Sequence, residues 1–133
     1  MKRYLILLLW LFGLLFPLGW LRGHSAGFRR WFDALFGAQW VHIVMHAALF
    51  AGLVIILALV FEVALNAKTA SLLLLAVLLV GVLQEYFQTA SAGRPFGGPE
   101  IFDLKIDLWG GLLGLGMLWA LERGKSESTI TQP

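Results

Sequence analysis

The order of apolar and polar residues divides the chain into four apolar stretches separated by short polar segments. A helix needs about 20 mostly apolar residues to cross a hydrocarbon core of roughly 30 Å. With the polar residues at their ends, all four stretches approach this length, and we expect them to cross at about residues 4–21, 41–65, 70–88 and 106–121. The pattern therefore predicts an all-α membrane protein, a four-transmembrane-helix bundle that forms a single domain.

The first stretch follows Lys2 and Arg3, a start that is common to membrane anchors and signal peptides. We expect it to be retained as a span, because its apolar region is too long for a signal peptide and residues 23–26 make a poor cleavage site. Pro17 is expected to kink or close this helix.

Between the first two spans, segment 22–40 mixes charged residues with aromatic ones. Spacings of three and four place Phe28, Trp31 and Phe32 on one helical face, which is typical of a short amphipathic helix lying in the membrane interface. An ordinary loop with scattered aromatic residues stays open as the alternative. At the other end of the chain, the polar tail 122–133 has no periodicity, and we expect it to be disordered.

The amino-acid composition indicates that lipid surrounds the protein, and it excludes several classes of site and partner. The chain is 59% hydrophobic and only 14% charged, whereas a soluble domain of this length leaves roughly a third of its surface in water. Its partner is therefore the lipid bilayer. The absence of cysteine excludes disulfides and thiolate metal sites. A net charge of +2, spread along the chain, offers no basic surface for nucleic acid.

Polar residues gather where three of the spans begin or end. Four spans of alternating direction bring the start of the second, the end of the third and the start of the fourth to one side of the membrane. Ionisable residues at membrane depth are costly, and they normally face the bundle interior and mark function. The candidate functional cluster, for ligand binding or for a structural polar network, contains His46, Glu85, Gln88, Arg94, Asp103 and Asp107.

Within this cluster, Arg94 is expected to pair with Glu85 or with Asp103, and either pair would hold the loop over the bundle. Once released from them, the same guanidinium could clamp a phosphate or carboxylate ligand. Gly110 and Gly114 allow another backbone to approach closely. We expect them to serve packing within the chain, with a dimer seam as the alternative, so the sequence leaves the oligomeric state undetermined.

The same positions carry a resemblance to a known family. In order along the chain they are His46 and Phe50; Gly81, Glu85, Gln88 and Arg94; and Asp103, Gly110 and Gly114. Over about residues 40–121, their order and spacing resemble the VanZ-like family, membrane proteins named for an accessory component of teicoplanin resistance. The chain departs from that pattern at His42, near the place of an Asp-Lys pair, and at Asp107, where Asn is usual.

The resemblance implies a multi-pass protein of the bacterial plasma membrane, related to the cell envelope and to glycopeptide antibiotics. We expect it to bind an anionic envelope ligand, such as a cell-wall precursor or a glycopeptide-type molecule, or a protein partner, without catalysis. The alternative is a membrane-embedded enzyme that acts on a lipid-linked substrate by carboxylate and histidine acid–base chemistry. We lean away from an enzyme because the sequence has no nucleophile motif and no phosphate-binding loop.

Two histidines four residues apart, His42 and His46, with carboxylates nearby suggest a divalent metal. Only one of the two belongs to the family pattern, and we therefore expect no metal and no cofactor. The commoner arrangement has His46 hydrogen-bonded to a carboxylate or a backbone carbonyl and His42 near water.

The orientation of the protein is weakly determined by its charges. Each side of the four-span topology holds five of the ten Lys and Arg residues. Because Lys2 and Arg3 directly precede the first span, we favour an amino terminus inside, which places the cluster outside.

Overall fold

The computed structural model describes residues 1–16, 21 and 23–130, with 125–130 in backbone only. Within these ranges all regular structure is helical. The helices are α1 (Lys2–Leu15), α3 (Ala26–Phe36), α4 (Gln39–Val60), α5 (Ala67–Ala92) and α6 (Gly98–Ile130). The expectation of an all-α protein is confirmed.

Three helices are long and apolar enough to cross a membrane: α4, α5 and the part of α6 from Gly98 to Gly124. Helix α1 has 14 residues, fewer than a typical span needs. The predicted first span continues into residues 17–20, which lie outside the described part of the chain. Three candidate spans are therefore established, and the fourth stays a prediction.

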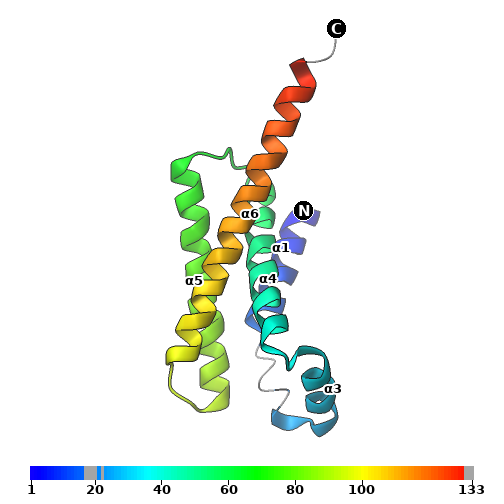
Figure 1. Ribbon diagram of the computed structural model, residues 1–133, viewed down its shortest axis with the longest axis vertical. Coiled ribbons are helices and arrows are strands. Elements are labelled where there is room, and N and C mark those ends of the chain that lie inside the picture. The colour runs from blue at the N-terminus through cyan, green and yellow to red at the C-terminus, as the bar shows by residue number, and fades with distance from the viewer. Residues whose placement is uncertain (17–20, 22, 131–133) are drawn as a thin grey trace.

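The three long helices run along the long axis of the molecule (Figure 1). Helix α6 packs on α4 and α5, while α1 packs on α4. In Figure 1, the connection between α4 and α5 lies at the same end as the carboxyl-terminal half of α6. Helix α3 and the connection between α5 and α6 lie at the other end. The beginnings of α4 and α6 and the end of α5 therefore meet at that second end.

Helix α1 runs antiparallel to α4. Near its start, Arg3 forms an ion pair with Glu62, just beyond the end of α4. In the middle, the Trp10 indole N–H donates a hydrogen bond to the Leu49 carbonyl at 3.1 Å. Hydrogen bonding to the Arg3 guanidinium holds the pKa of the Glu62 carboxyl below its usual value. These contacts lay α1 along the bundle, with its end beside the beginning of α4.

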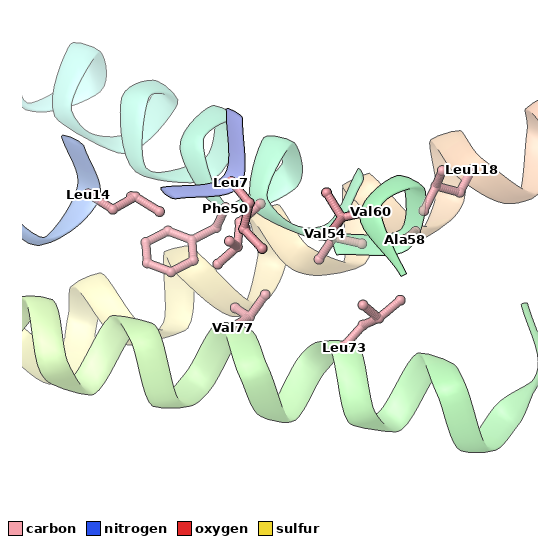
Figure 2. Close-up of a cluster of buried hydrophobic side chains, with 10 residues drawn as sticks. Leu7, Leu14, Phe50, Val54, Ala58, Val60, Leu73, Val77 and Leu118 are labelled. Carbon is pink, nitrogen blue, oxygen red and sulfur yellow. The ribbon is translucent and has the colours of Figure 1, made fainter. Parts of the chain in front are cut away.

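The hydrophobic core joins α1, α4, α5 and α6 (Figure 2). Leu7 and Leu14 come from α1 and lie over the buried Phe50 of α4. Val77 of α5 and Leu118 of α6 belong to the same cluster. Helix α1 thus buries apolar side chains against the three long helices.

Two glycines bring α6 close to α4. A Cβ atom added to Gly114 would lie 2.6 Å from the Ala51 carbonyl oxygen, and one on Gly110 would overlap the Ala47 backbone. Gly110 and Gly114 therefore lie at a contact within the chain. At that contact the two backbones approach more closely than any side chain would allow.

The helix boundaries differ from those predicted. Helix α4 ends at Val60 rather than near residue 65, because Glu62 adopts a left-handed conformation (φ 52°) and the Val63 N–H donates to the Ala58 carbonyl at 3.0 Å. Helix α5 begins earlier than predicted, after a capping box in which Asn66 and Thr69 each cap the other's backbone N–H.

The carboxyl-terminal helix departs most from its prediction. Helix α6 starts at Gly98 instead of about residue 106, and it takes in Asp103 and Asp107, which interrupt the apolar pattern. It continues to Ile130, through most of the tail that was expected to be disordered. Residues 131–133 lie outside the described part.

Segment 22–40 contains a helix, as predicted. Ser25 caps α3 by accepting a hydrogen bond from the Phe28 N–H at 3.2 Å. Phe28 contacts Trp31 and Phe32, and both of these contact Phe36, so the aromatic rings of α3 form one cluster. The placement of this helix in the membrane interface stays a prediction.

Candidate functional site

Two histidine–aspartate pairs link α4 to α6 at one end of the bundle. His42 Nε2 lies 3.0 Å from Asp103 Oδ1, and His46 Nδ1 lies 2.8 Å from Asp107 Oδ1. The two members on each helix are four residues apart, so they share one helical face. The pairs therefore form two successive links between the same two helices, and the centres of the two imidazole rings are 4.4 Å apart.

The inner pair is deeply buried. The side chains of His46 and Asp107 are 7% and 0% exposed, whereas those of His42 and Asp103 are 43% and 15% exposed. An ionised carboxylate only accepts hydrogen bonds, so with Asp107 ionised the His46 Nδ1–H is the donor. This bond satisfies two polar groups whose burial would otherwise be costly. The prediction that His46 hydrogen-bonds a carboxylate is confirmed.

Helix α5 brings a third carboxylate and an amide to the same region. Glu85 and Gln84 are buried, and Asp107 is close enough to Glu85 for their charges to interact. Gly81 leaves room for α6: a Cβ atom there would lie 2.8 Å from Asp107 Oδ2. Within the described part of the chain, three buried oxygens have no hydrogen-bond partner: Gln84 Oε1, Glu85 Oε1 and Asp107 Oδ2. Most buried polar atoms in proteins are hydrogen-bonded, so three unpaired acceptors on α5 and α6 make this end of the bundle a candidate site.

Arg94 does not join this group. Its guanidinium hydrogen-bonds Glu100, and the other Glu100 oxygen accepts from the Gly97 N–H at 2.7 Å. The expected pairing of Arg94 with Glu85 or Asp103 is therefore wrong. Arg94 instead ties the loop between α5 and α6 to the first turn of α6.

Glu100 was not predicted as part of the cluster, although the sequence carries a pattern that identifies it. A glutamate three residues after a helix N-cap typically reaches back to the N-cap N–H. Gly97, Gly98, Pro99 and Glu100 fit that pattern, with proline in the first turn. The pattern was overlooked because the apolar run that suggested a span begins later.

A cavity of about 430 Å³ opens beside the two histidines, among the end of α1, α3, the start of α4 and the end of α5. Its walls are mostly apolar and include Leu14, Phe36 and Leu49. The polar side chains that line it are those of Asp33, Gln39, His42, His46, Gln84 and Gln88. The described lining residues contain no lysine or arginine. Of the predicted cluster, His46 and Gln88 thus line the cavity, while Asp103 and Asp107 hold the two histidine rings from α6.

One group of side chains has a composition and spacing suited to a metal ion. His42, His46 and Asp103 each offer one ligand atom, and these atoms all lie within 4.8 Å of one another. Two imidazole nitrogens and one carboxylate oxygen are a donor set for zinc and similar divalent ions.

No family model, curated protein or solved structure matches the chain. The resemblance to the VanZ-like family therefore depends on the motif residues alone.

Proposed function

We propose that the chain is a multi-pass protein of a bacterial plasma membrane, of VanZ-like type, which binds an anionic ligand of the cell envelope without catalysing a reaction. The support is that residues from three separate motif fragments meet at one end of the bundle. His46 of α4 hydrogen-bonds Asp107 of α6 at 2.8 Å, and the buried Glu85 of α5 lies one turn after Gly81, which packs against Asp107. Alternating spans alone would bring these residues to one depth, but they meet only because each helix also turns its polar side chain inward.

In this proposal α1 is the first of four spans. Its antiparallel packing on α4 and its share of the core are what a crossing beside α4 requires. Helix α3 then lies in the interface at the cavity end, where exposed Trp31 and Leu35 can contact lipid. That arrangement opens the cavity towards the headgroup layer.

The shape and the lining of the cavity support the proposed class of ligand. Small-molecule sites are typically clefts of about 300–1,000 Å³ with mostly apolar walls and a few convergent polar groups, and this cavity fits that description. Apolar walls suit the first carbons of a lipid chain, while His42 and the side-chain amide of Gln88 can hydrogen-bond an anionic oxygen. A lipid-linked anionic headgroup, as in cell-wall precursors, satisfies both requirements.

Binding without catalysis is favoured by the composition of the cavity wall. Among the described residues that line it there is no serine, threonine, cysteine or lysine to act as a nucleophile. Attack on a ligand seated there by a hydroxyl, thiol or amine side chain therefore has no agent among those residues.

The test is native mass spectrometry of protein purified from bacterial membranes in mild detergent. We expect an anionic envelope lipid to be retained, and retention to fall at least tenfold in Gln88→Leu, which removes a polar group from the cavity. Tyr86→Phe is the matched control, because Tyr86 is exposed on the same helix and does not line the cavity. Equal retention in both variants would contradict the proposed site.

A second candidate function is supported by the geometry of His46. Its imidazole lines the cavity while buried Asp107 holds the opposite side of the ring, which is how a general base is oriented in many hydrolases. The chain would then be a membrane-embedded enzyme that uses a water nucleophile on a lipid-linked substrate. Turnover of a labelled lipid-linked precursor that is lost in Asp107→Asn would favour this reading over simple binding.

A further inference from the structure

We infer that His42, His46 and Asp103 form a binding site for one divalent transition-metal ion, with Zn²⁺ as the ion that fits best. The ion would lie between α4 and α6, at the polar end of the cavity that both histidines line. Two histidines one helical turn apart present their rings on one face, which is a common way for a helix to supply two metal ligands.

The distances suit a shared ion. Around a tetrahedral ion with bonds of about 2.1 Å, neighbouring ligand atoms are about 3.4 Å apart. His42 Nε2 and Asp103 Oδ1 are 3.0 Å apart, so an ion can replace the proton between them with little movement. One ligand atom from each of the three residues already falls within 4.8 Å of the other two. Small rotations of the His42 and Asp103 side chains, both partly exposed, would complete the shell.

Asp107 positions the third ligand. Metal-bound histidines usually donate their other ring N–H to a carboxylate, which fixes the tautomer and the orientation of the ring. His46 Nδ1 lies 2.8 Å from a buried Asp107 oxygen. With that nitrogen engaged, the lone pair of Nε2 is left for the metal. Asp107 thus has the place of the outer carboxylate in a carboxylate–histidine–metal arrangement.

The charge around the site also favours a cation. Asp103 and Asp107 lie one turn apart on α6, and Gly81, one turn before the buried Glu85 on α5, packs against Asp107. In the described part of the chain, the hydrogen-bond partners of Asp103 and Asp107 are the two histidines. Glu85 Oε1 and Gln84 Oε1 are buried acceptors without a partner among the described residues, and the guanidinium of Arg94 is engaged by Glu100. A bound cation would supply the positive charge that this region lacks.

The site also deepens the proposed function, and in this respect it rests on that function. Three protein ligands leave at least one coordination position of zinc open. Because His42 and His46 line the cavity, we place that position towards it, where it can take an anionic oxygen of the bound ligand. The metal would then hold the anionic group that Arg94 was predicted to clamp.

The experiment uses the full chain, purified without a polyhistidine tag, stripped with chelator and titrated with Zn²⁺ and with Co²⁺. We expect one equivalent of Zn²⁺ by calorimetry and elemental analysis, and Co²⁺ absorption bands typical of nitrogen and oxygen ligands. His42→Gln and Asp103→Asn should each weaken binding about 100-fold or more, since each removes a ligand. Asp107→Asn should weaken it by about 10- to 100-fold, as loss of an outer partner does.

His24→Gln is the matched control, because it makes the same substitution at a histidine outside the group of potential ligands. Thermal unfolding of the stripped proteins checks that the variants fold. Binding that is absent from the wild-type chain, or equal in the wild type, His42→Gln and Asp103→Asn, would overturn the metal site.

Lipid retention measured on the stripped and the zinc-loaded protein separates this inference from the proposed function. Lipid retained without any zinc binding would overturn the metal site and leave the proposed function standing. One equivalent of zinc bound without lipid retention would leave the metal site standing and overturn the proposed ligand.

Discussion

The buried His46 and Asp107 side chains show how a membrane helix can hold a charged group. Each would be costly to bury alone, and each satisfies the other across the contact between α4 and α6. Hydrogen bonds between membrane helices contribute about 0.6 kcal/mol on average and up to about 1.7 kcal/mol. The completely buried position of Asp107 should place this pair at the upper end of that range.

A double-mutant cycle tests this coupling. We expect His46→Ala and Asp107→Ala each to lower the free energy of unfolding by about 1–3 kcal/mol, because each leaves a buried polar group unpaired. The double variant should be little worse than either single variant, which gives a coupling energy of about 1–2 kcal/mol. Unfolding in denaturing detergent measures all four proteins. Strictly additive effects would show that the two side chains do not interact.

The pairing of Arg94 with Glu100 leads to a second prediction. Arg94→Ala leaves the buried Glu100 carboxylate without its cationic partner, so the loop between α5 and α6 should become more sensitive to protease and the melting temperature should fall. Arg94→Lys should restore part of the loss, because it keeps the charge but not the planar geometry.

Lys105→Ala is the control, because Lys105 is exposed on α6. If Arg94→Ala behaved like this control, the ion pair would have no structural role.

At the residue scale, the sequence predicted which groups would gather but not how they would pair. Alternating spans place His46, Glu85 and Asp107 at one depth whatever their side-chain orientations, and the structure brings them together. Pairing depends on the rotation of each helix about its axis, which periodicity does not fix for helices that are apolar on all sides. Arg94 was therefore assigned to Glu85 or Asp103, although Glu100 was only six residues away.

At the element scale, the glycines of α6 set the distance between helices and therefore the geometry of the site. Gly110 and Gly114 let α6 contact the α4 backbone at Ala47 and Ala51. Both histidine–aspartate links cross the same pair of helices. The links can form only if the two helices stay this close.

A valine at Gly110 tests this dependence. We expect Gly110→Val to force α6 away from α4 and to lower the free energy of unfolding by about 1–3 kcal/mol, the usual cost of overpacking. Gly116→Val is the matched control, since a Cβ atom added at Gly116 has nothing within 4 Å. Thermal unfolding in detergent compares the two. Equal stability of the variants would mean that the close contact is absent.

The ends of the elements were harder to predict than their existence. The apolar pattern placed the start of the last span at about residue 106, beyond Asp103, because a charged residue is a poor candidate for membrane depth. The helix nevertheless begins at Gly98 and carries Asp103 and Asp107 inside the bundle, where the histidines of α4 pair with them. That compensation comes from a partner about sixty residues away, and no local pattern contains it.

At the scale of the whole molecule, the proposed site requires that the helix ends that form it lie on the same side of the membrane. The structure places the beginning of α4, the end of α5 and the beginning of α6 at one end (Figure 1), as successive helices of alternating direction require. Helix α1 packs antiparallel to α4, but its 14 residues do not reach the length of a typical span. The helical structure was thus predictable from hydropathy, whereas the number of helices that cross the membrane was not.

The most direct test of the central claim is the accessibility of single cysteines in intact cells, for which the chain is suited because it contains no native cysteine. Ala38→Cys and Ala92→Cys, both at exposed positions, should react from the same compartment. Lys2→Cys and Lys68→Cys should react from the opposite one. If Lys2→Cys were labelled from the same compartment as Ala38→Cys, only the prediction that the first stretch crosses the membrane would be wrong. Labelling of Ala38 and Ala92 from opposite compartments would contradict the account, because the histidines of α4 and the polar end of α5 could then share no site.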